Sequence, residues 1–151
     1  MKFTPRNINR FNFLKLPAAY FTGVRARYID QTKCIVTVKH SWINQNPFNS
    51  MFWAVQGMAA ELTTGALLLS KIKTSGYPIS MLVVNINGNF TKKATGRITF
   101  ECTQGNLIEL AIQKAVETRE GQTIWLKATG KNKENIQVSS FDFQWTIKLK
   151  N

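Results

Sequence analysis

The chain has 151 residues, of which 44% are hydrophobic and 11% aromatic, so it should fold as one packed domain and is not an intrinsically disordered protein. Its 20 Lys and Arg residues against 8 Asp and Glu give a net charge of +12, which should attract anions such as phosphate-bearing small molecules, nucleic acid or acidic lipid. The basic residues are scattered rather than gathered in runs, so a solvated basic surface explains the charge equally well.

The cysteines and the N-terminal segment indicate where in the cell the protein is expected. Cys34 and Cys102 come without a CxxC pair or a histidine cluster, which predicts buried, reduced thiols and no metal site. The N-terminus lacks an apolar run of signal-peptide length, so we expect a cytoplasmic protein. The apolar stretch 51–69 is interrupted by Glu61, whose insertion into a bilayer would cost about 2.5–3.5 kcal/mol. We therefore expect a buried helix and no membrane association.

The first half of the chain predicts a helix, a hairpin and a long helix. A short helix should end near Tyr20, and the alternating segments VRARYID and TKCIVTVKH should pair across Asp30 and Gln31. The loop NQNPFNS offers Asn49 or Ser50 as the N-cap of a helix over 51–69. Its apolar residues recur every three or four positions and should pack on a sheet: Phe52, Val55, Ala59, Leu62, Ala66 and Leu69.

The second half predicts four more strands and one helix. ISMLVVNINGNF and GRITFEC read as strands, 103–121 as a helix closed by Gly121, and TIWLKATGK with QVSSFDFQWTIKLK as a final hairpin. This order indicates a single α+β domain with a largely antiparallel sheet. Phe141, Phe143 and Trp145 alternate along the last strand, a pattern more typical of a core than of base stacking, so nucleic-acid binding is a minor alternative.

The carboxylate of Glu61 stands out within the long apolar helix. On a helix its neighbours are Gly57, Met58, Thr64 and Gly65. Glycine disfavours a helix interior by about 0.5–1 kcal/mol relative to alanine, so something should approach this face closely. A functional interpretation makes Glu61 a general base or nucleophile with a raised pKa. A structural interpretation, which the residues alone favour, gives it hydrogen bonds or an ion pair and uses the glycines for close packing.

The stretch from Asn46 to Gly65 resembles the active-site loop and central helix of the hotdog-fold superfamily, in the branch of small thioesterases of the phenylacetate type. That branch has an Asn, a His-Gly-Gly six residues later at the start of the long helix, and an Asp or Glu nine residues after the His. Asn46, Phe52 and Glu61 stand at these spacings, so the Asn and the acid match, whereas FWA replaces His-Gly-Gly.

A wider resemblance covers nearly the whole chain. FNFLKLPAAYFTGVRARYID, NQNPFNSMFWAVQGMAAELTTGALLL and SSFDFQWTIK are similar to an uncharacterised, thioesterase-like hotdog family labelled a domain of unknown function. The resemblance implies a single hotdog domain over residues 1–151, in which a curved antiparallel sheet wraps a long central helix. It also implies a homodimer or a tetramer with the acyl-thioester site between subunits.

The resemblance also implies roles for individual residues. Glu61 would activate water or attack the thioester carbonyl, and Asn46 would orient the water or the thioester. The backbone N–H groups of Trp53 and Ala54 would polarise the carbonyl at the helix N-terminus. Phe52 and Gly57 would border the substrate, and Lys92 would lie near the coenzyme A phosphates. No cofactor is expected other than coenzyme A as part of the substrate.

Two functions follow from this comparison of residues. The first is hydrolysis of an acyl thioester carried by coenzyme A or by an acyl carrier protein. The second is binding of an acyl ligand without turnover, because the bulk of Trp53 in the FWA sequence replaces a glycine that permits close approach.

Overall fold

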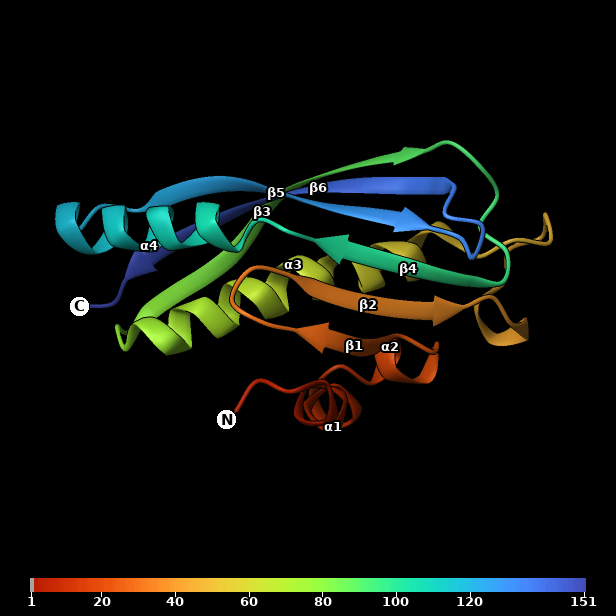
Figure 1. Ribbon diagram of the computed structural model, residues 1–151, viewed down its shortest axis with the longest axis horizontal. Coiled ribbons are helices and arrows are strands. Elements are labelled where there is room, and N and C mark those ends of the chain that lie inside the picture. Colours follow the sequence, from red (N-terminus) through yellow and green to blue (C-terminus); the bar gives the residue numbers. More distant parts are fainter. Residues whose placement is uncertain (1) are drawn as a thin grey trace.

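One long helix lies across a six-stranded antiparallel sheet (Figure 1). The structure is a computed structural model and describes residues 2–151. The strands, in the sheet order β1-β2-β4-β5-β6-β3, have bounds β1 (Arg25–Ile29), β2 (Cys34–Lys39), β3 (Ile79–Phe90), β4 (Arg97–Cys102), β5 (Gln122–Lys131) and β6 (Gln137–Leu149). The helices are α1 (Pro5–Lys15), α2 (Pro17–Phe21), α3 (Trp53–Ser75) and α4 (Gly105–Thr118), with a 3₁₀ helix η1 (Trp42–Asn44).

The architecture is the expected α+β hotdog fold. The curved sheet wraps α3, which contacts strands from both halves of the sheet, while α4 packs against β5 and β6 (Figure 1). The two N-terminal helices lie beside β1. All six strands predicted from the sequence are present, because their β-branched and alternating apolar residues suit a half-buried pleated surface.

The N-terminal helix differs from its prediction, because the single helix expected up to Tyr20 is two helices. The break falls at Leu16, which has an irregular backbone, and α2 begins directly after it at Pro17. Proline lacks the N–H that a continuous helix needs and restricts the residue before it. The chain therefore turns between α1 and α2.

The predicted start of the long helix is wrong. Phe52, not Asn49 or Ser50, is the N-cap residue, and the helix continues to Ser75 before Gly76 ends it in the left-handed conformation. Asn49 itself has a positive φ of 58°. The Ser50 hydroxyl bonds to the side chain of Asn46, so it is committed to the loop and does not cap the helix.

The apolar stripe predicted on α3 is divided between two surroundings. Val55, Ala59 and Ala66 are buried as expected, whereas Phe52 is 45% exposed. Leu62 and Leu69 are only partly buried and line a cavity beneath α1 and α2. The predicted stripe is divided because the sheet covers one side of α3 and the N-terminal helices cover another.

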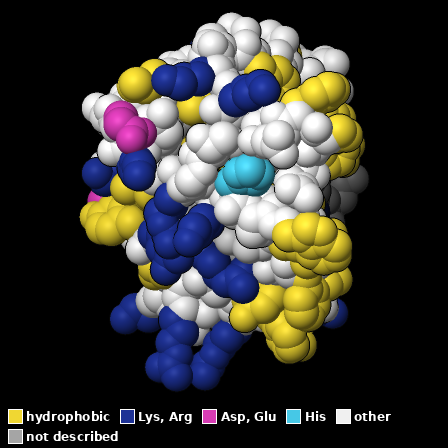
Figure 2. All heavy atoms as spheres, turned by 90° about the vertical axis from the view of Figure 1, so that its right-hand side faces the viewer, with side chains coloured by type: hydrophobic (Ala, Val, Ile, Leu, Met, Phe, Trp, Pro, Cys, Tyr) yellow, Lys and Arg dark blue, Asp and Glu magenta, His cyan; other side chains and the backbone are white. Residues whose placement is uncertain are grey.

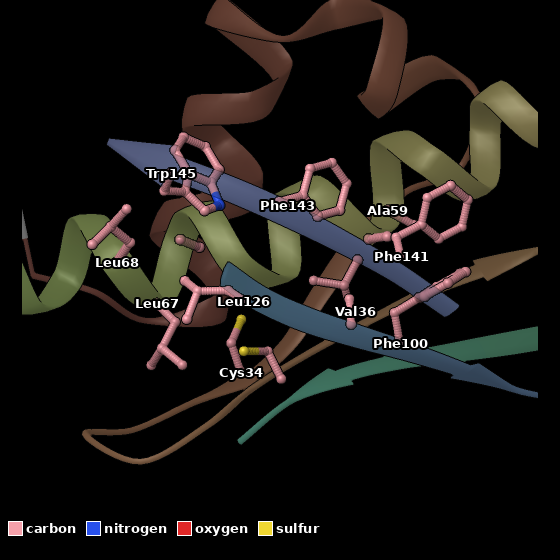
Figure 3. Close-up of a cluster of buried hydrophobic side chains, with 14 of the residues drawn as sticks. Cys34, Val36, Ala59, Leu67, Leu68, Phe100, Leu126, Phe141, Phe143 and Trp145 are labelled. Atoms are coloured by element: carbon pink, nitrogen blue, oxygen red, sulfur yellow. The ribbon is translucent and has the colours of Figure 1, made fainter. Parts of the chain in front are cut away.

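The core lies between α3 and the sheet (Figure 3). Phe141, Phe143 and Trp145 are buried there, which confirms that this aromatic row belongs to the core. Cys34 and Cys102 are cross-strand partners, buried and free, as predicted. Burial raises the pKa of the Cys34 thiol to about 12 and that of Cys102 to about 11.

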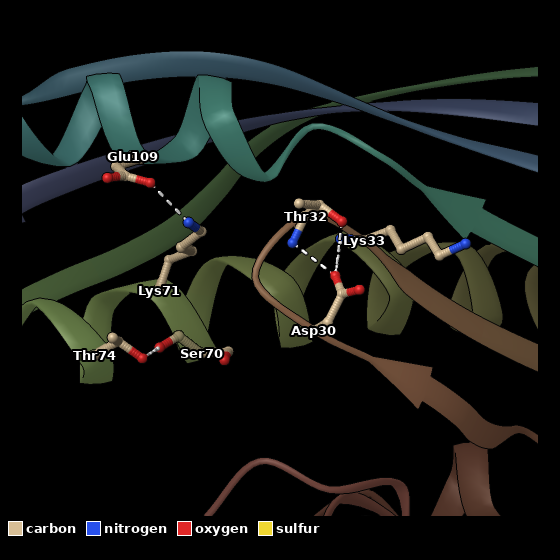
Figure 4. A network of polar contacts seen from close by, with 7 residues as sticks. All are labelled: Asp30, Thr32, Lys33, Ser70, Lys71, Thr74 and Glu109. Atoms are coloured by element: carbon tan, nitrogen blue, oxygen red, sulfur yellow. Dashed lines mark hydrogen bonds and ion pairs between the residues drawn. The ribbon is translucent and has the colours of Figure 1, made fainter.

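Polar contacts fix two connections around α3 (Figure 4). The buried amine of Lys71 on α3 pairs with Glu109 on α4 at 2.8 Å. In the turn between β1 and β2, one carboxylate oxygen of Asp30 accepts from the backbone N–H groups of Thr32 and Lys33. Hydrogen bonds from Tyr28 and this turn lower the pKa of Asp30 well below its usual range. The ion pair ties α4 to the long helix, and the hydrogen bonds of Asp30 fix the turn of the β1–β2 hairpin.

The two edge strands of the sheet, β1 and β3, differ in whether another group pairs with them. At the β1 edge, the side chain of Asn9 on α1 donates to Ala26 O at 3.1 Å and accepts from Ala26 N at 2.8 Å, so it pairs with the strand as a neighbouring backbone would. At the other edge, β3 has twelve residues without a charge, and Leu82 and Ile86 are exposed. Edges of this kind are usually covered.

No helix within residues 2–151 is long and apolar enough to cross a membrane.

Candidate functional site

Glu61 lines a cavity of about 470 Å³ between α3 and the N-terminal helices. The volume falls in the range of small-molecule sites. Most of the wall is apolar. The residues from α3 and β3 are Met58, Glu61, Leu62, Gly65, Ala66, Leu69 and Met81, and those from the N-terminal segment are Phe3, Ile8, Phe11, Asn12, Lys15, Leu16, Pro17, Ala18 and Ala19.

The carboxylate of Glu61 has no ion-pair partner among residues 2–151. Within residues 2–151 the ion pairs join Lys71 to Glu109 and Lys127 to Asp142, and neither involves Glu61. Its side chain is exposed at the cavity, yet the surrounding walls remove part of its solvent shell. This desolvation raises the pKa of Glu61 above its ordinary value. The structural interpretation allowed Glu61 an ion pair, and within the described residues it forms none.

The two glycines near Glu61 serve close packing on the sheet. A Cβ atom at Gly65 would lie 3.2 Å from the ring of Trp145, and one at Gly57 would lie 3.6 Å from Phe141. The indole N–H of Trp145 also donates to Thr64 Oγ1 at 3.1 Å. The closely approaching groups predicted from the glycine pair are therefore aromatic rings of β6, and Gly65 lines the Glu61 cavity as well.

Four of the other predicted site residues meet in a separate pocket of about 480 Å³ at the start of α3. Asn46, Phe52, Trp53 and Lys92 all line it. The side chain of Asn46 organises the loop: its oxygen accepts from Phe48 N at 2.9 Å, and its amide donates to the Ser50 hydroxyl at 2.9 Å. This loop pocket is thus built around Asn46.

The first amides of α3 point out of the helix without a partner among the described residues. Phe52, the N-cap residue, makes no side-chain cap bond. The first backbone N–H bonded within the helix is that of Val55, which donates to Phe52 O at 3.1 Å. The N–H groups of Trp53 and Ala54 are therefore available to an external acceptor, at the end of the helix where the dipole favours negative charge.

A single chain does not bring all the predicted residues together. Trp53 and Glu61 are eight residues apart on one helix, which places them about 12 Å apart along its axis. Glu61 lines the cavity under α1 and α2, whereas Asn46 and Lys92 line the loop pocket. Any chemistry that uses both sets of groups needs a long substrate or a second copy of the chain.

Positive charge gathers at the end of the sheet near the loop pocket. Figure 2 shows Lys and Arg side chains clustered on this end, beside a strip of exposed hydrophobic side chains. Lys39 and Arg97 are cross-strand partners and both are exposed. Lys92 is exposed in the loop after β3, and the amine of Lys93 donates to Phe48 O at 3.1 Å. Like charges placed opposite each other favour binding of an anion between them.

Sequence reasoning missed the N-terminal wall of the Glu61 cavity. Asn12 and Lys15 line the cavity from α1, and Asn12 is only 1% exposed. Three asparagines occur on this helix, and nothing in their spacing separates the one that lines a cavity from the one that pairs with β1. Only the packing of α1 against α3 distinguishes them. No group of three or more His, Cys, Asp or Glu side chains that could hold a metal ion occurs in the described part of the chain.

The sequence matches the family described as a domain of unknown function, DUF4442, over residues 9–147. The chain belongs to this family. The matched range contains every residue of the loop pocket and all residues of the Glu61 cavity except Phe3 and Ile8. No curated protein matches the sequence.

Solved structures share the fold of this DUF4442 chain along nearly its whole length. A Pseudomonas aeruginosa protein of unknown function, named a probable thioesterase, has a TM-score of 0.82 at 19% identity, covering 97% of each chain. A Chlorobaculum tepidum protein of unknown function has a TM-score of 0.82 at 22% identity, covering 97% of this chain and 94% of its own. A Haemophilus influenzae thioesterase has a TM-score of 0.71 at 14% identity, with 99% and 93% covered. The similarity establishes a thioesterase-like hotdog fold.

Proposed function

We propose that this protein hydrolyses acyl thioesters, with the acyl chain in the Glu61 cavity. The observation that carries the proposal is a carboxylate that has a raised pKa and no ion-pair partner among residues 2–151, on the wall of a mostly apolar cavity. An apolar wall suits an acyl chain, and a perturbed carboxylate in a pocket is a candidate base or nucleophile. The thioesterase names carried by similar structures support the same class of substrate.

The chemistry follows from the charges that develop during hydrolysis. Glu61 accepts a proton from water as the water oxygen bonds to the thioester carbonyl carbon. The carbonyl oxygen becomes an oxyanion, which the free N–H groups of Trp53 and Ala54 stabilise. The C–S bond then breaks, and the sulfur leaves as a thiol after taking the proton from Glu61. The products are a carboxylic acid and a free thiol.

A homodimer would bring the two sets of groups together. Glu61 and the α3 N-terminus of one chain are about 12 Å apart, so we propose that the loop and helix start of one copy act with Glu61 of the other. Strand β3 is the natural contact, because α1 packs beside the opposite edge and bonds to it through Asn9, while β3 is long, uncharged and exposes apolar side chains. Antiparallel pairing of two β3 strands gives the two-fold symmetry typical of dimers.

The basic end of the sheet favours a polyanionic carrier. Lys92 lines the loop pocket, and Lys39 and Arg97 are cross-strand partners at the ends of β2 and β4; these three side chains would bind the phosphates of coenzyme A. The same charges would also attract an acidic acyl carrier protein, and both carriers deliver a thioester.

Release of free thiol from a panel of acyl-CoAs tests the proposal, with Glu61→Gln beside the wild type. Because a general base contributes typically 10²–10⁴-fold, Glu61→Gln should lower kcat/KM by at least ~100-fold. Glu134→Gln, in the exposed turn before β6, is the matched control and should leave the rate unchanged. A rate that Glu61→Gln does not lower, or no thiol release above background, would remove the proposal.

The alternative function is binding of an acyl ligand without turnover. Trp53 favours it, because its side chain is 59% exposed at the helix start, where a bulky ring limits the approach of a thioester to the free amides. Binding to the native state raises the melting temperature by mass action. Stabilisation by acyl-CoA with no release of thiol would favour this alternative over catalysis.

A further inference from the structure

Exposed apolar side chains gather where α1 meets α2. Phe13 is 49% exposed and Leu14 72%, Leu16 between the two helices is 46% exposed, and Phe21 is 60% exposed. The ring centroid of Phe13 lies 5.1 Å from that of Tyr20 and 6.0 Å from that of Phe21, so the two helices form one surface. We call Phe13, Leu14, Leu16 and Phe21 the N-terminal patch. Contiguous exposed apolar surface marks sites that bind a protein, a ligand or a membrane.

Two arginines border the N-terminal patch on the outer face of α1. Ile8 and Asn12 are the buried residues of this helix, so side chains on its opposite side point outward. Arg6 and Arg10 lie one turn apart on that side, and Phe13 follows Arg10 by three residues. Both arginines are exposed, and neither forms an ion pair within residues 2–151. The apolar end of the helix is thus followed, one and two turns back, by unpaired positive charge.

The charge of the N-terminal segment has a single sign. The first 29 residues include six Lys and Arg and no Asp or Glu, and the first acidic residue, Asp30, is in the turn after β1. A surface helix that combines Phe and Leu with Lys and Arg is typical of helices that lie in the interface of a membrane. The apolar side chains enter the interface while the long Arg side chains reach the lipid phosphates. This segment therefore complements a negatively charged lipid surface.

The N-terminal patch adjoins the opening of the Glu61 cavity. Phe11, Lys15 and Leu16 line this cavity and are also exposed, so the cavity reaches the surface beside the patch. Leu16 belongs to both. A surface that covers the patch would therefore also lie against the opening of the cavity.

We propose that the N-terminal patch binds the surface of an anionic lipid bilayer. The expectation of no membrane association rested on the stretch 51–69 as a spanning segment, whereas this adsorption uses α1 and α2. In the proposed dimer the copies pair through β3, at the other edge of the sheet from β1, on which α1 packs. An acyl chain would enter the Glu61 cavity directly from the bilayer, a step that rests on the proposed function.

Co-sedimentation with lipid vesicles tests the inference. One vesicle preparation is phosphatidylcholine alone, and the other is equal parts of phosphatidylcholine and phosphatidylglycerol. The wild type should bind the anionic vesicles, dissociate from them as salt is added, and bind the neutral vesicles far less. Leu14→Ser should weaken binding to the anionic vesicles about tenfold, through the lost apolar contact. Arg10→Glu should weaken it by at least about fivefold, through the lost attraction.

Two matched variants separate the N-terminal patch from the overall charge of the protein. Lys133→Glu changes the net charge as much as Arg10→Glu does, in the exposed turn between β5 and β6. Leu110→Ser removes a leucine that is 63% exposed on α4. Both variants should bind the anionic vesicles as the wild type does. Absence of wild-type binding, or equal weakening by Lys133→Glu and Arg10→Glu, would overturn the inference. If the wild type binds no vesicles and Leu14→Ser changes the mass in sedimentation equilibrium, the patch is instead a contact between copies.

The membrane inference and the proposed hydrolysis fail separately. Adsorption without thiol release from any acyl-CoA would sustain the N-terminal patch and remove the thioesterase proposal, and thiol release without adsorption would do the reverse. If both hold, Arg10→Glu should release thiol more slowly than the wild type from palmitoyl-CoA carried on anionic vesicles. On a short acyl-CoA in solution the two should be equal. Equal rates on the vesicles would overturn entry of the acyl chain from the bilayer.

Discussion

The indole nitrogen of Trp145 and the hydroxyl of Thr64 are joined by a buried hydrogen bond of 3.1 Å between β6 and α3. The bond fixes how the long helix is rotated on the sheet. Because Thr64 faces β6, Glu61, one turn earlier, lies at the border between the sheet-facing side and the side that faces α1. The position of the candidate base thus depends on a contact made by its helical neighbour.

Replacing Thr64 with valine should destabilise the protein by roughly 1–3 kcal/mol, because the Trp145 N–H is then buried without an acceptor. The adjacent Thr63 is equally buried, but its hydroxyl donates only to Ala59 O within its own helix. Thr63→Val should therefore cost much less. Urea unfolding of both variants measures the difference, and equal losses would show that the bond to Trp145 contributes nothing particular.

The two glycines of α3 should respond in opposite ways to alanine. Gly57→Ala places a methyl group at ordinary contact distance from Phe141, so the gain in helix propensity should stabilise the protein by about 0.5–1 kcal/mol. Gly65→Ala places it 3.2 Å from the ring of Trp145, which its hydrogen bond to Thr64 holds in place. That clash should cancel or reverse the gain. Thermal unfolding of the two variants compares them, and equal stabilisation would contradict the fixed position of the ring.

The sequence allowed the fold to be predicted further than the site. The strands were predictable because alternation and β-branching are local properties, and the turn at Asp30 lies between two such segments. The start of α3 was not, because Ser50 has the right chemistry for a cap but is bonded to Asn46. The place of Asn12 on the cavity wall could not be predicted, because the burial of its side chain without hydrogen-bond partners depends on how α1 packs over α3 and not on its neighbours in the sequence.

Glu61→Gln should stabilise the protein at neutral pH. The pKa of Glu61 is raised in the folded state, so the folded wild type loses stability as the pH rises from about 4.5, the ordinary value, through the raised pKa. Glutamine does not titrate and avoids this loss. Denaturant unfolding at pH 7 and pH 4 should show the advantage of Glu61→Gln shrinking in acid.

Asp30→Asn provides a control of opposite sign for this pH dependence. The pKa of Asp30 is lowered by its hydrogen bonds from Tyr28 and the turn, so its contribution is present above the ordinary value of 3.8 and disappears as the pH falls through the lowered pKa. Asp30→Asn should thus be the less stable protein at pH 7. Because Asp30 is only partly buried, solvent makes this effect small. An advantage of Glu61→Gln that grows in acid would contradict the raised pKa.

A lysine at Ile86 should separate the proposed dimer into monomers. Ile86 is 60% exposed on the uncovered strand β3, and a lysine on an edge strand opposes pairing with another edge. Leu110, 63% exposed on α4, provides a matched control, because Leu110→Lys adds the same charge away from β3. Sedimentation equilibrium should give twice the chain mass for the wild type and Leu110→Lys but the mass of one chain for Ile86→Lys. Since the proposed site uses groups from both copies, thiol release should fall together with the dimer. A monomeric wild type that retains full activity would show that one chain is sufficient for the reaction.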